Sequence, residues 1–447
     1  MNKSVVIVGG GLVGTLLACV LGRRGFEVDI YEKRPDLRKQ GLLGGRSINL
    51  ALSDRGLRGL RLAGLEEKVK PILIPMRRRV MHDIEGELTY QPYSEEGHFI
   101  NSVSRAKLNA FLLDMAESQP NVRIHFQHDC RKIDLQKNEI QFLLADKSQK
   151  NVSYEWLIGG DGAFSPVRRA LMHTDRFNFS QTFLDYGYKE LSIPPTTSGD
   201  FAMEVNALHI WPRESFMLIA LPNPDKTFTA TLFLPFEGKN SFQSLHRQGE
   251  ARQFFQTYFP DALKIMPYFD QEFSQNPTSS LVIIKNNPWV RNNVALIGDA
   301  AHAIVPFYGQ GMNAGFEDCV VLNELLDKYQ DDLEKALPEF QALRIPDANA
   351  ISELALQNFV EMRDLVGKPE FLLRKKIEAR IHAQVPQWIP LYTMVTFSQM
   401  RYSEALRIGK LQDEVMADLM TDKNILNNWE SIDFSKEKRI LEYLKKI

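Results

Sequence analysis

The sequence predicts an α/β fold that has a Rossmann-like domain, an inserted β-rich domain and a C-terminal helical region. Three observations predict it. At the N-terminus, a glycine-rich turn stands between an apolar strand and a helix, as in a β-α-β unit. Residues 180–285 change to strand signals separated by turns. After residue 316 the chain is almost entirely helix-forming.

The composition is that of a globular protein with a balanced charge. Its 447 residues are 44% apolar and 25% charged, and the formal net charge is -2. A chain of this size buries a large core and divides into two or three domains. Because both signs of charge are interspersed, we expect no nucleic acid and no anionic membrane as the principal partner. A small, locally recognised ligand is the expected partner instead.

The cysteines and the N-terminus bear on the compartment. Cys19, Cys130 and Cys319 are too few and too dispersed for a disulfide framework or a zinc site, so we expect buried free thiols and no metal. The start MNKSVVIVGGG passes directly into a strand, without the segments of a signal peptide. No apolar run approaches the roughly 18 residues of a membrane span. The expected location is the cytoplasm.

The N-terminal elements follow from hydrophobic patterns. The β-branched run SVVIV at 4–8 predicts a strand, residues 15–25 predict a helix, and VDIYEKR at 28–34 predicts a second strand. Residues 41–66 are glycine-rich at first and then helical in period.

The middle of the chain alternates between strand and helix signals. Short alternating pieces between 72 and 103 predict antiparallel strands, and residues 105–118 predict an amphipathic helix. Further strands are expected at VRIHF, CRKIDL, EIQFLL and YEWLIGGDG, and in the second domain at NALHIWP, FMLIALPNPDKTFTATLFLPF and SSLVIIK.

The turn after the first strand has a GxGxxG pattern formed by Gly9, Gly11 and Gly14. A backbone without Cβ atoms there lets a pyrophosphate approach the positive helix N-terminus. Glu32 ends the second strand about twenty residues later, where a carboxylate accepts hydrogen bonds from a ribose. The pattern predicts a dinucleotide site without deciding between FAD and NAD. A glycine turn that only packs helix on strand is the alternative.

Two later strand ends each carry Gly-Asp or Asp-Gly. Asp161 stands in GGDGAFSPVR, and Asp299 stands in VALIGDAAHAIVPFYGQGMNAGFEDC. If both strands belong to one parallel sheet, both carboxylates lie at the edge where open α/β sheets bind ligands. Each alone would be an ordinary turn, so the prediction depends on their conjunction.

With these three motifs in this order, the sequence resembles the class A FAD-dependent aromatic hydroxylases. The resemblance implies an FAD-binding domain, an inserted β-sheet substrate domain and C-terminal helices that cover the active site. The expected boundaries are 1–70, 100–180 and 285–340 for the FAD-binding domain, 71–99 and 181–284 for the substrate domain, and 341–447 for the helical region.

The resemblance also implies roles for residues of the motifs. Asp299 would hold the ribityl chain of FAD, and Pro306 would shape the front of the flavin ring. The helix that begins at 309–313 would point unpaired amides at the flavin and stabilise the negative charge of its reduced form. The implied catalytic segment is Pro306, Phe307, Tyr308, Gly309 and Gln310, without a unique role for Tyr308 and without a general base. The implied FAD-binding residues are Gly9, Gly11, Leu12, Val13, Gly14, Glu32, Lys33, Arg105, Asp161, Asp299, Gly311, Met312 and Asn313.

Arg105 is a further candidate FAD-binding residue, and the sequence offers no separate domain for the reductant. Arg105 matches an arginine that the family uses on the flavin, although a surface charge at a helix N-terminus is the alternative. GQGMNAG at 309–315 has the wrong spacing for a second GxGxxG and lacks the strand and acid that would follow it. NADPH is therefore expected to visit transiently, without a domain of its own. The absence counts against the two-domain disulfide reductases, which also show a redox cysteine pair.

Longer stretches resemble the kynurenine 3-monooxygenase family more specifically. They include GGRSINLALSDRGLRGLRLAGL at 44–65, HDIEGELTYQPY at 82–93, NALHIWP at 206–212 and VPFYGQGMNAGFEDC at 305–319. The membrane-anchoring C-terminal segment of the eukaryotic enzymes is missing, which implies a bacterial-type version. The resemblance implies Arg79 and Tyr93 for the substrate carboxylate, Asn358 and Tyr392 for the polar end, and Leu208, Ile219, Leu221, Phe233, Phe307 and Met362 as pocket walls.

The run Arg77-Arg78-Arg79 can be judged from the residues alone. Strand alternation puts Arg77 and Arg79 on one face and Arg78 on the other, so at least one arginine must face the interior or a cleft. A guanidinium fork binds a carboxylate with two hydrogen bonds. A solvated basic face is the alternative, and for the apolar wall residues it is plain core.

The implied activity is NADPH-dependent hydroxylation of L-kynurenine to 3-hydroxy-L-kynurenine by FAD and dioxygen, through a flavin hydroperoxide, in tryptophan degradation towards NAD. An aniline nitrogen already activates the ring position, so little help from a base is needed. The alternatives are a hydroxylase of another aromatic acid, a flavin-binding redox module without turnover and an NAD-dependent dehydrogenase.

Overall fold

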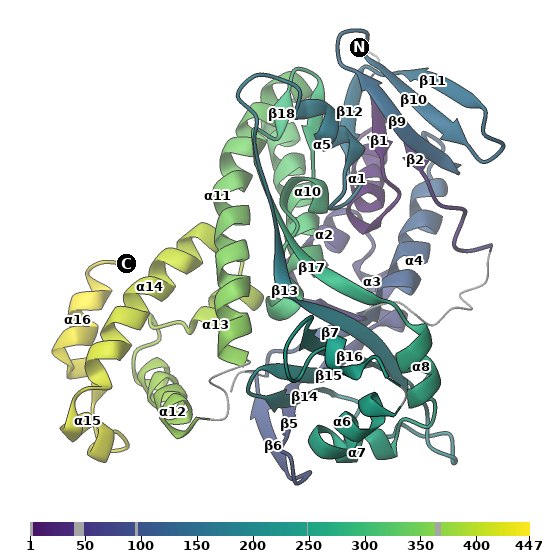
Figure 1. Ribbon diagram of the computed structural model, residues 1–447. Coiled ribbons are helices and arrows are strands. Elements are labelled where there is room, and N and C mark those ends of the chain that lie inside the picture. The colour runs from purple at the N-terminus through teal and green to yellow at the C-terminus, as the bar shows by residue number, and fades with distance from the viewer. Residues whose placement is uncertain (1–2, 40–48, 94–96, 248, 363–367) are drawn as a thin grey trace.

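The computed structural model describes residues 3–39, 49–93, 97–247, 249–362 and 368–447. Figure 1 shows the parallel sheet and its helices above, a large antiparallel sheet below, and a helical region to one side. The glycine-rich start of the predicted segment 41–66, which includes residues 44–48 of the family-like stretch, lies outside the described residues.

A six-stranded sheet forms the upper part. Its order is β18-β19-β12-β1-β2-β8, and all neighbours are parallel except β18 and β19. Val8 at the end of β1 pairs with Gly159 at the end of β12, and Gly159 pairs with Leu296 at the end of β19. The two Gly-Asp strands therefore belong to one parallel sheet, as predicted. The strands are β1 Ser4–Val8, β2 Glu27–Glu32, β8 Val122–Phe126, β12 Trp156–Gly159, β18 Val290–Arg291 and β19 Val294–Leu296.

Helices pack around this sheet because its strands are apolar on both faces. Val5, Ile7, Val28 and Ile30 have no exposed surface, as expected for a buried parallel sheet. The helices are α1 Leu12–Arg23, α2 Asp54–Leu62, α3 Glu66–Val69 with η1 Lys70–Ile72, α4 Arg105–Glu117, α5 Pro166–Leu171, α9 Asp299–His302 and α10 Gly311–Lys328.

Two three-stranded antiparallel sheets adjoin this part. One, in the order β11-β10-β9, consists of β9 His128–Asp134, β10 Glu139–Leu144 and β11 Gln149–Ser153. The other, in the order β3-β7-β4, consists of β3 Asn49–Leu52, β4 Ile74–Met76 and β7 Ile100–Ser104. Because β7 leads directly into α4, it places Arg105 at a helix N-terminus, as the sequence predicts.

A seven-stranded sheet forms the lower part. Its order is β17-β13-β16-β15-β14-β5-β6, and only β5 and β14 are parallel. One face packs on three short helices through a phenylalanine-rich core that includes Phe254, Phe255 and Phe259. The elements are β5 Arg78–His82, β6 Leu88–Pro92, β13 Asn178–Ile193, β14 Ala207–Arg213, β15 Phe216–Pro222, β16 Phe228–Pro235, η2 Gln243–Leu245, α6 Glu250–Tyr258, α7 Pro260–Lys264, α8 Phe269–Gln275 and β17 Thr278–Asn287.

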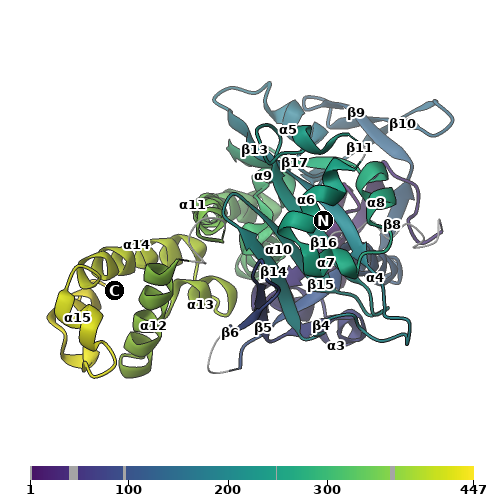
Figure 2. The same cartoon turned by 60° about the horizontal axis from the view of Figure 1, so that its bottom comes forward.

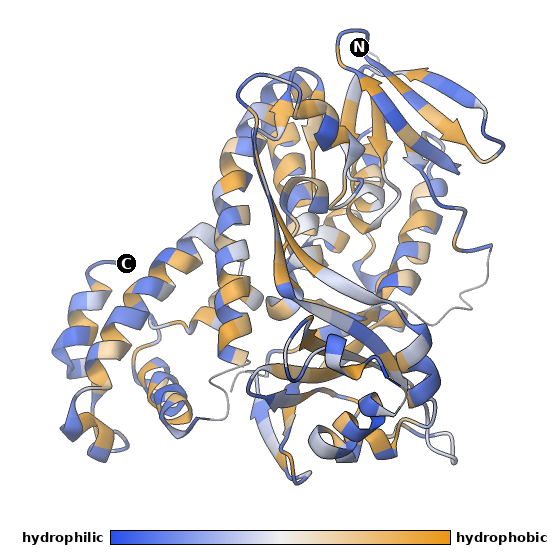
Figure 3. Ribbon diagram, in the orientation of Figure 1, coloured by the Kyte–Doolittle hydropathy of each residue, from blue (hydrophilic) through white to orange (hydrophobic). Residues whose placement is uncertain are grey.

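The C-terminal part is helical. The long α11 runs along the first two parts, and the last helices stand to one side, as Figure 2 also shows. They alternate hydrophilic and hydrophobic residues (Figure 3) and share a core with Trp388, Tyr402 and Tyr443. The elements are η3 Pro306–Tyr308, α11 Leu333–Val360, α12 Pro369–Gln384, α13 Leu391–Thr396, α14 Tyr402–Leu419, α15 Lys423–Asn428, η5 Phe434–Lys436 and α16 Lys438–Leu444. Among the described helices, none is both long enough and apolar enough to cross a membrane.

Candidate active site

A cavity of about 750 Å³ opens where the carboxyl ends of the parallel strands meet the seven-stranded sheet. Residues of all three motif loops line it, and so do Arg79 and Tyr392. The chain therefore brings most of the predicted cofactor residues and most of the predicted substrate residues to one continuous space.

The glycines of the first motif have different surroundings. A Cβ at Gly9 would lie 2.4 Å from the Gly160 carbonyl oxygen, and one at Gly14 would lie 2.2 Å from the Gly9 carbonyl oxygen. These two positions therefore need glycine for close packing of strand, turn and helix. A Cβ at Gly11 would meet nothing within 4 Å, and Gly11 lines the cavity together with Leu12 and Val13. The open space at Gly11 is what a phosphate approaching the α1 N-terminus requires.

Glu32 is buried at the end of β2 and lines the cavity with Lys33 and Arg34. Its Oε2 accepts a hydrogen bond from the Gly10 amide at 2.9 Å, and its Oε1 accepts one from Arg34 Nε at 2.7 Å. Burial opposes ionisation, but the Arg34 contacts outweigh it and hold the pKa of Glu32 below its usual range. Glu32 is therefore a fixed anion, and a ribose hydroxyl could donate to it.

The two aspartates of the other motifs both line the cavity. Burial raises the pKa of Asp161 to about 6, and its Oδ1 is buried without a hydrogen-bond partner among the described residues. Asp299 is exposed at the first position of α9, just after Gly298, whose φ of 59° a glycine adopts without strain. Both carboxylates are thus available to a ligand.

Asp318 supports the Asp299 turn and was not predicted. Its Oδ2 accepts a hydrogen bond from the Gly298 amide at 3.0 Å and lies 2.6 Å from His302 Nε2. Burial opposes ionisation of Asp318, but His302 and Arg344 outweigh it and hold its pKa below the usual range. The adjacent Glu317 and Asp318, both buried in the first half of α10, were the sequence signal for this role.

The start of α10 faces the same cavity. Gly309, Gly311 and Met312 line it, and the side chain of the N-cap residue Gln310 makes no capping hydrogen bond. Asn313 does not line the cavity but holds the loop, because its Nδ2 donates to the Gly309 and Ala51 carbonyls at 2.8 Å each. The uncapped amides fit an electron-rich group such as the pyrimidine edge of a flavin.

Arg79 lies at the far end of the cavity beside two tyrosines. Its guanidinium carbon is 4.5 Å from the Tyr392 ring centroid and 5.2 Å from that of Tyr93, and the two rings are nearly parallel. Burial opposes its charge, but Tyr392 and Tyr93 keep the pKa of Arg79 above its usual range. Among the described residues, no carboxylate lies within ion-pair distance of it.

Tyr93 does not line the cavity, but its hydroxyl is buried without a partner among the described residues. Burial raises the pKa of Tyr93, so the phenol stays protonated and can donate a hydrogen bond. A guanidinium without a carboxylate partner among the described residues, beside a protonated phenol, is an arrangement that suits a carboxylate.

Apolar side chains surround the space between Arg79 and the start of α10. Phe307 stacks on Phe359, with ring centroids 4.1 Å apart, and its backbone carbonyl accepts a hydrogen bond from Asn358 Nδ2 at 2.7 Å. Asn358 therefore holds the loop from behind instead of lining the cavity. The predicted wall residues that do line it are Leu208, Ile219, Leu221, Phe233, Phe307 and Met362, together with Pro306 and Tyr308.

The cavity lining differs in part from the predicted set of site residues. Arg105 lines the cavity, whereas Gly14 and Gln310 do not. Lining residues that the sequence analysis missed include Asn49, His128, Arg131, Phe164, Arg169, Tyr188, Met217 and Thr231. Phe164 and Arg169, in or beside the second motif, and Asn49, in the family-like stretch 44–65, had a sequence signal.

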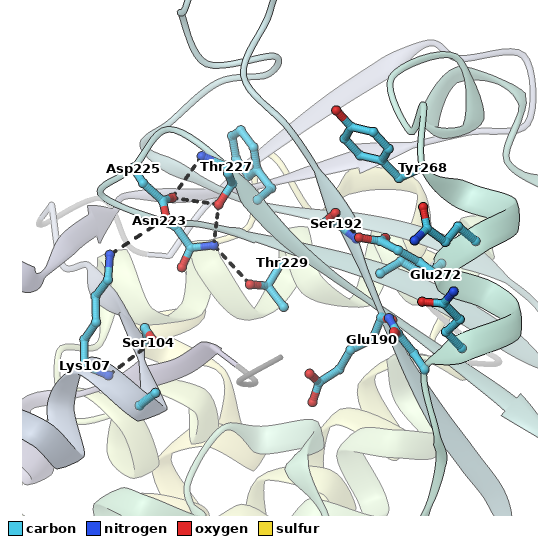
Figure 4. A pocket seen from close by; sticks show the side chains of 16 residues that line it. Ser104, Lys107, Glu190, Ser192, Asn223, Asp225, Thr227, Thr229, Tyr268 and Glu272 are labelled. Carbon is cyan, nitrogen blue, oxygen red and sulfur yellow. Dashed lines mark hydrogen bonds and ion pairs between the residues drawn. The ribbon is translucent and has the colours of Figure 1, made fainter. Parts of the chain in front are cut away.

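A second pocket, of about 480 Å³, lies between α4, β13 and α8. Figure 4 shows Lys107 on one side, reaching towards Asp225 at 3.9 Å, and Ser192 beside Glu272 on the other. Its carboxylates have partners, and it contains none of the three motif loops.

The second pocket nevertheless touches the first through a chain of hydrogen bonds. Asn223 Nδ2 donates to Thr227 and Thr229 at 3.0 Å each (Figure 4). Thr229 in turn donates to Asn49 Oδ1 at 3.3 Å, and Asn49 lines the first cavity. This chain fixes the orientation of the Asn49 amide.

The residues present fit FAD. Gly11 offers space for the pyrophosphate, Glu32 offers an acceptor for the ribose, Asp299 stands at the cavity edge for the ribityl chain, and the uncapped α10 offers amides for the ring. Asp161, with an unpartnered buried oxygen, provides a further acceptor.

Comparison with known proteins agrees with this geometry. The family described as FAD binding domain matches residues 2–332. A kynurenine 3-monooxygenase of Christiangramia forsetii is 46% identical and covers 100% of this chain and 99% of its own length. A kynurenine 3-monooxygenase of Sus scrofa is 46% identical and covers 93% of this chain and 88% of its own length.

Solved structures resemble this fold at lower identity. 2-Methyl-3-hydroxypyridine-5-carboxylic acid oxygenase has a TM-score of 0.67 at 19% identity and covers 82% of this chain and 94% of its own. PqsL from Pseudomonas aeruginosa, in complex with 2-aminobenzoylacetate, has a TM-score of 0.65 at 22% identity, with coverages of 81% and 97%. At these identities the likeness shows the fold alone. Because its relatives match along the whole chain and the cofactor family matches most of it, the protein belongs to the kynurenine 3-monooxygenase family of FAD-dependent monooxygenases.

Proposed function

We propose that the protein hydroxylates L-kynurenine to 3-hydroxy-L-kynurenine, with NADPH as reductant and dioxygen as oxygen source. The observation that supports it most is Arg79, which has no carboxylate partner among the described residues, beside the Tyr93 hydroxyl at the end of an apolar cavity that begins at the FAD-binding motifs. Curated relatives that match the chain from end to end carry the name of this activity.

The side chains account for how such a substrate would be held. Arg79 and Tyr93 would bind the carboxylate, and Tyr392 would cover the polar end. Leu221, Phe233 and the other apolar walls would hold the aromatic ring towards the start of α10. When bound, FAD would supply the chemistry that the side chains lack, namely acceptance of electrons from NADPH and activation of dioxygen. Arg79 is half-buried and has no carboxylate partner among the described residues, so pairing with a substrate carboxylate would stabilise its charge and favour an acidic ligand.

The chain also accounts for the absence of a general base. The ring amino group of an aniline already enriches the ortho carbon in electrons, so electrophilic attack there needs no deprotonated side chain. Tyr308 also lines the cavity, and burial raises the pKa of its phenol well above the ordinary value, so the phenol stays protonated. Tyr308 stacks on Tyr392 at 5.4 Å and would serve as a wall.

Exclusion of water is the second requirement. Met362 and Tyr392, from the C-terminal part, complete the cavity wall, and Phe359 backs Phe307. An apolar cover limits the loss of activated oxygen as hydrogen peroxide. The predicted division into an FAD-binding domain, a substrate domain and a covering helical region remains a proposal. We also propose a cytoplasmic location, which the three buried free cysteines support.

The test measures NADPH oxidation by the purified yellow protein with and without L-kynurenine, and identifies the product by mass spectrometry. Substrate-stimulated oxidation with a product one oxygen atom heavier, hydroxylated beside the amino group, is expected. Stimulation by another aromatic acid alone would replace the substrate, and no stimulation by any aromatic acid would favour a flavin-binding module without turnover.

A further inference from the structure

The loop between η3 and α10 is held from the C-terminal part at two points. At its start, Asn358 on α11 donates to the Phe307 carbonyl at 2.7 Å. At its end stands Gln310, which is 1% exposed and occupies the N-cap position of α10. Its neighbours Gly309 and Gly311 both line the cavity. Whatever holds Gln310 therefore helps to hold the helix N-terminus that faces the flavin site.

Tyr402, the first residue of α14, holds Gln310. Its hydroxyl donates to Gln310 Oε1 at 2.9 Å, and its ring is completely buried. Burial raises the pKa of the Tyr402 phenol above its usual range, so the hydroxyl keeps its proton and remains a donor. Because this contact joins residues 92 positions apart, it ties the cavity loop to the C-terminal helices.

Arg55 fixes Tyr402 in turn. The Arg55 guanidinium lies 4.1 Å from the Tyr402 ring centroid and has no exposed surface. It donates to Glu317 Oε1 on α10 at 2.5 Å, to the Val395 carbonyl at 2.9 Å and to the Met400 carbonyl. One side chain of α2 thus joins α10 to the connection between α13 and α14.

Buried charges at this junction are balanced. Glu317 accepts from Arg55 on one oxygen and from Arg344 on the other, the latter at 2.7 Å. A packing contact between helices would need no such groups, and taking them out of water is costly unless each is paired. The ion pair with Glu317 fixes Arg55, and Arg55 lies over the Tyr402 ring. Tyr402 therefore has one well-defined position, from which its hydroxyl reaches Gln310.

We propose that Tyr402 is a positioning residue, whose hydroxyl fixes Gln310 and thereby the orientation of the α10 N-terminus at the flavin site. Through it, the docking of the C-terminal helices changes the electric field at the flavin, because the uncapped amides of an 18-residue helix carry partial positive charge. The catalytic consequence rests on the proposed function, whereas the spectroscopic consequence does not.

The experiment compares Tyr402→Phe with Tyr443→Phe in the FAD-loaded protein. Tyr443 is a matched control because it is also a buried C-terminal tyrosine, whose hydroxyl contacts Gln412 at 3.1 Å, on α14. Both variants lose one buried hydroxyl. We expect equal FAD content and similar thermal midpoints, but a shifted flavin absorption spectrum in Tyr402→Phe only. With L-kynurenine, kcat should fall about 3- to 10-fold, as for loss of one neutral hydrogen bond, with KM for NADPH unchanged and more peroxide released.

A second experiment tests whether Tyr402 acts through Gln310. In a Gln310→Met background, Tyr402→Phe should cause no further spectral shift, because the acceptor is already missing. The proposal is overturned if the Tyr402→Phe spectrum equals that of the wild type or of Tyr443→Phe, or if the two substitutions shift it additively. If L-kynurenine elicits no turnover in the wild type, the proposed function fails, and the spectra still decide the role of Tyr402.

Discussion

Replacing Arg79 by alanine tests the proposed substrate clamp most directly. The guanidinium now lies 4.5 Å and 5.2 Å from two tyrosine ring centroids, without a carboxylate at ion-pair distance among the described residues. If a substrate carboxylate pairs with it, its removal leaves that carboxylate desolvated and unpaired. Such a loss costs about 2–5 kcal/mol, or roughly 30- to 5,000-fold in affinity. Lysine should restore only part of the loss, because an ammonium cannot form the planar two-bond fork.

The neighbouring Arg78 provides a matched control. It is exposed and donates to Glu204 at 2.8 Å, on the surface. Because exposed ion pairs contribute about 0–1 kcal/mol, Arg78→Ala should leave substrate affinity and stability nearly unchanged. Equal effects of Arg78→Ala and Arg79→Ala would indicate a general loss of positive charge instead of a clamp.

The assay titrates L-kynurenine, and an analogue that lacks the carboxylate, into FAD-loaded wild type and Arg79→Ala, with the flavin signal as readout. The analogue should bind the wild type poorly and should distinguish little between the two proteins, because both changes delete the same pair. FAD content should stay constant. Additive losses in this cycle would remove Arg79 from the site and refute the reasoning.

The other predictions concern the cofactor end. Gly11→Val should abolish tight FAD binding while leaving the far-UV circular dichroism unchanged, because a Cβ added at position 11 meets no protein atom within 4 Å. Gly9→Ala should destabilise the fold instead, because a Cβ added at position 9 would lie 2.4 Å from the Gly160 carbonyl oxygen. Glu32→Ala and Asp299→Ala should each lower FAD retention in gel filtration more than they lower substrate affinity, and selectively weakened kynurenine binding would contradict this. Because burial raises the pKa of Asp161 to about 6, the folded apoprotein binds a proton more tightly than the unfolded chain. Its thermal midpoint should therefore fall as the pH rises from about 4 to 6, and Asp161→Asn should flatten that dependence.

The sequence by itself determined the cofactor end of the site. A strand followed by a glycine turn is a local pattern, so the motifs with Gly11, Asp161 and Asp299 could be placed at strand ends without a structure. Parallel strands bring their carboxyl ends to one edge, which made the three loops neighbours by geometry alone. The two-residue period of a strand accounts for Arg78 being exposed while Arg79 lines the cavity, but the prediction that Arg77 shares the face of Arg79 is wrong, because Arg77 precedes β5. That Arg79 and not Arg77 faces the cavity agrees with the resemblance to the family, since Arg77 is exposed before β5 begins.

Without the family resemblance, only the tertiary structure shows which distant side chains complete the site. Tyr93 and Tyr392 stack beside Arg79 although about three hundred positions separate them in the chain. Gln310 turns from the cavity towards Tyr402, and Asp318 turns back to the Gly298 amide. Hydrophobic periodicity states which face of an element is buried, but not which partner it meets. These contacts arise when helices from the end of the chain pack on loops from its middle, and packing of that range has no local signature in the sequence.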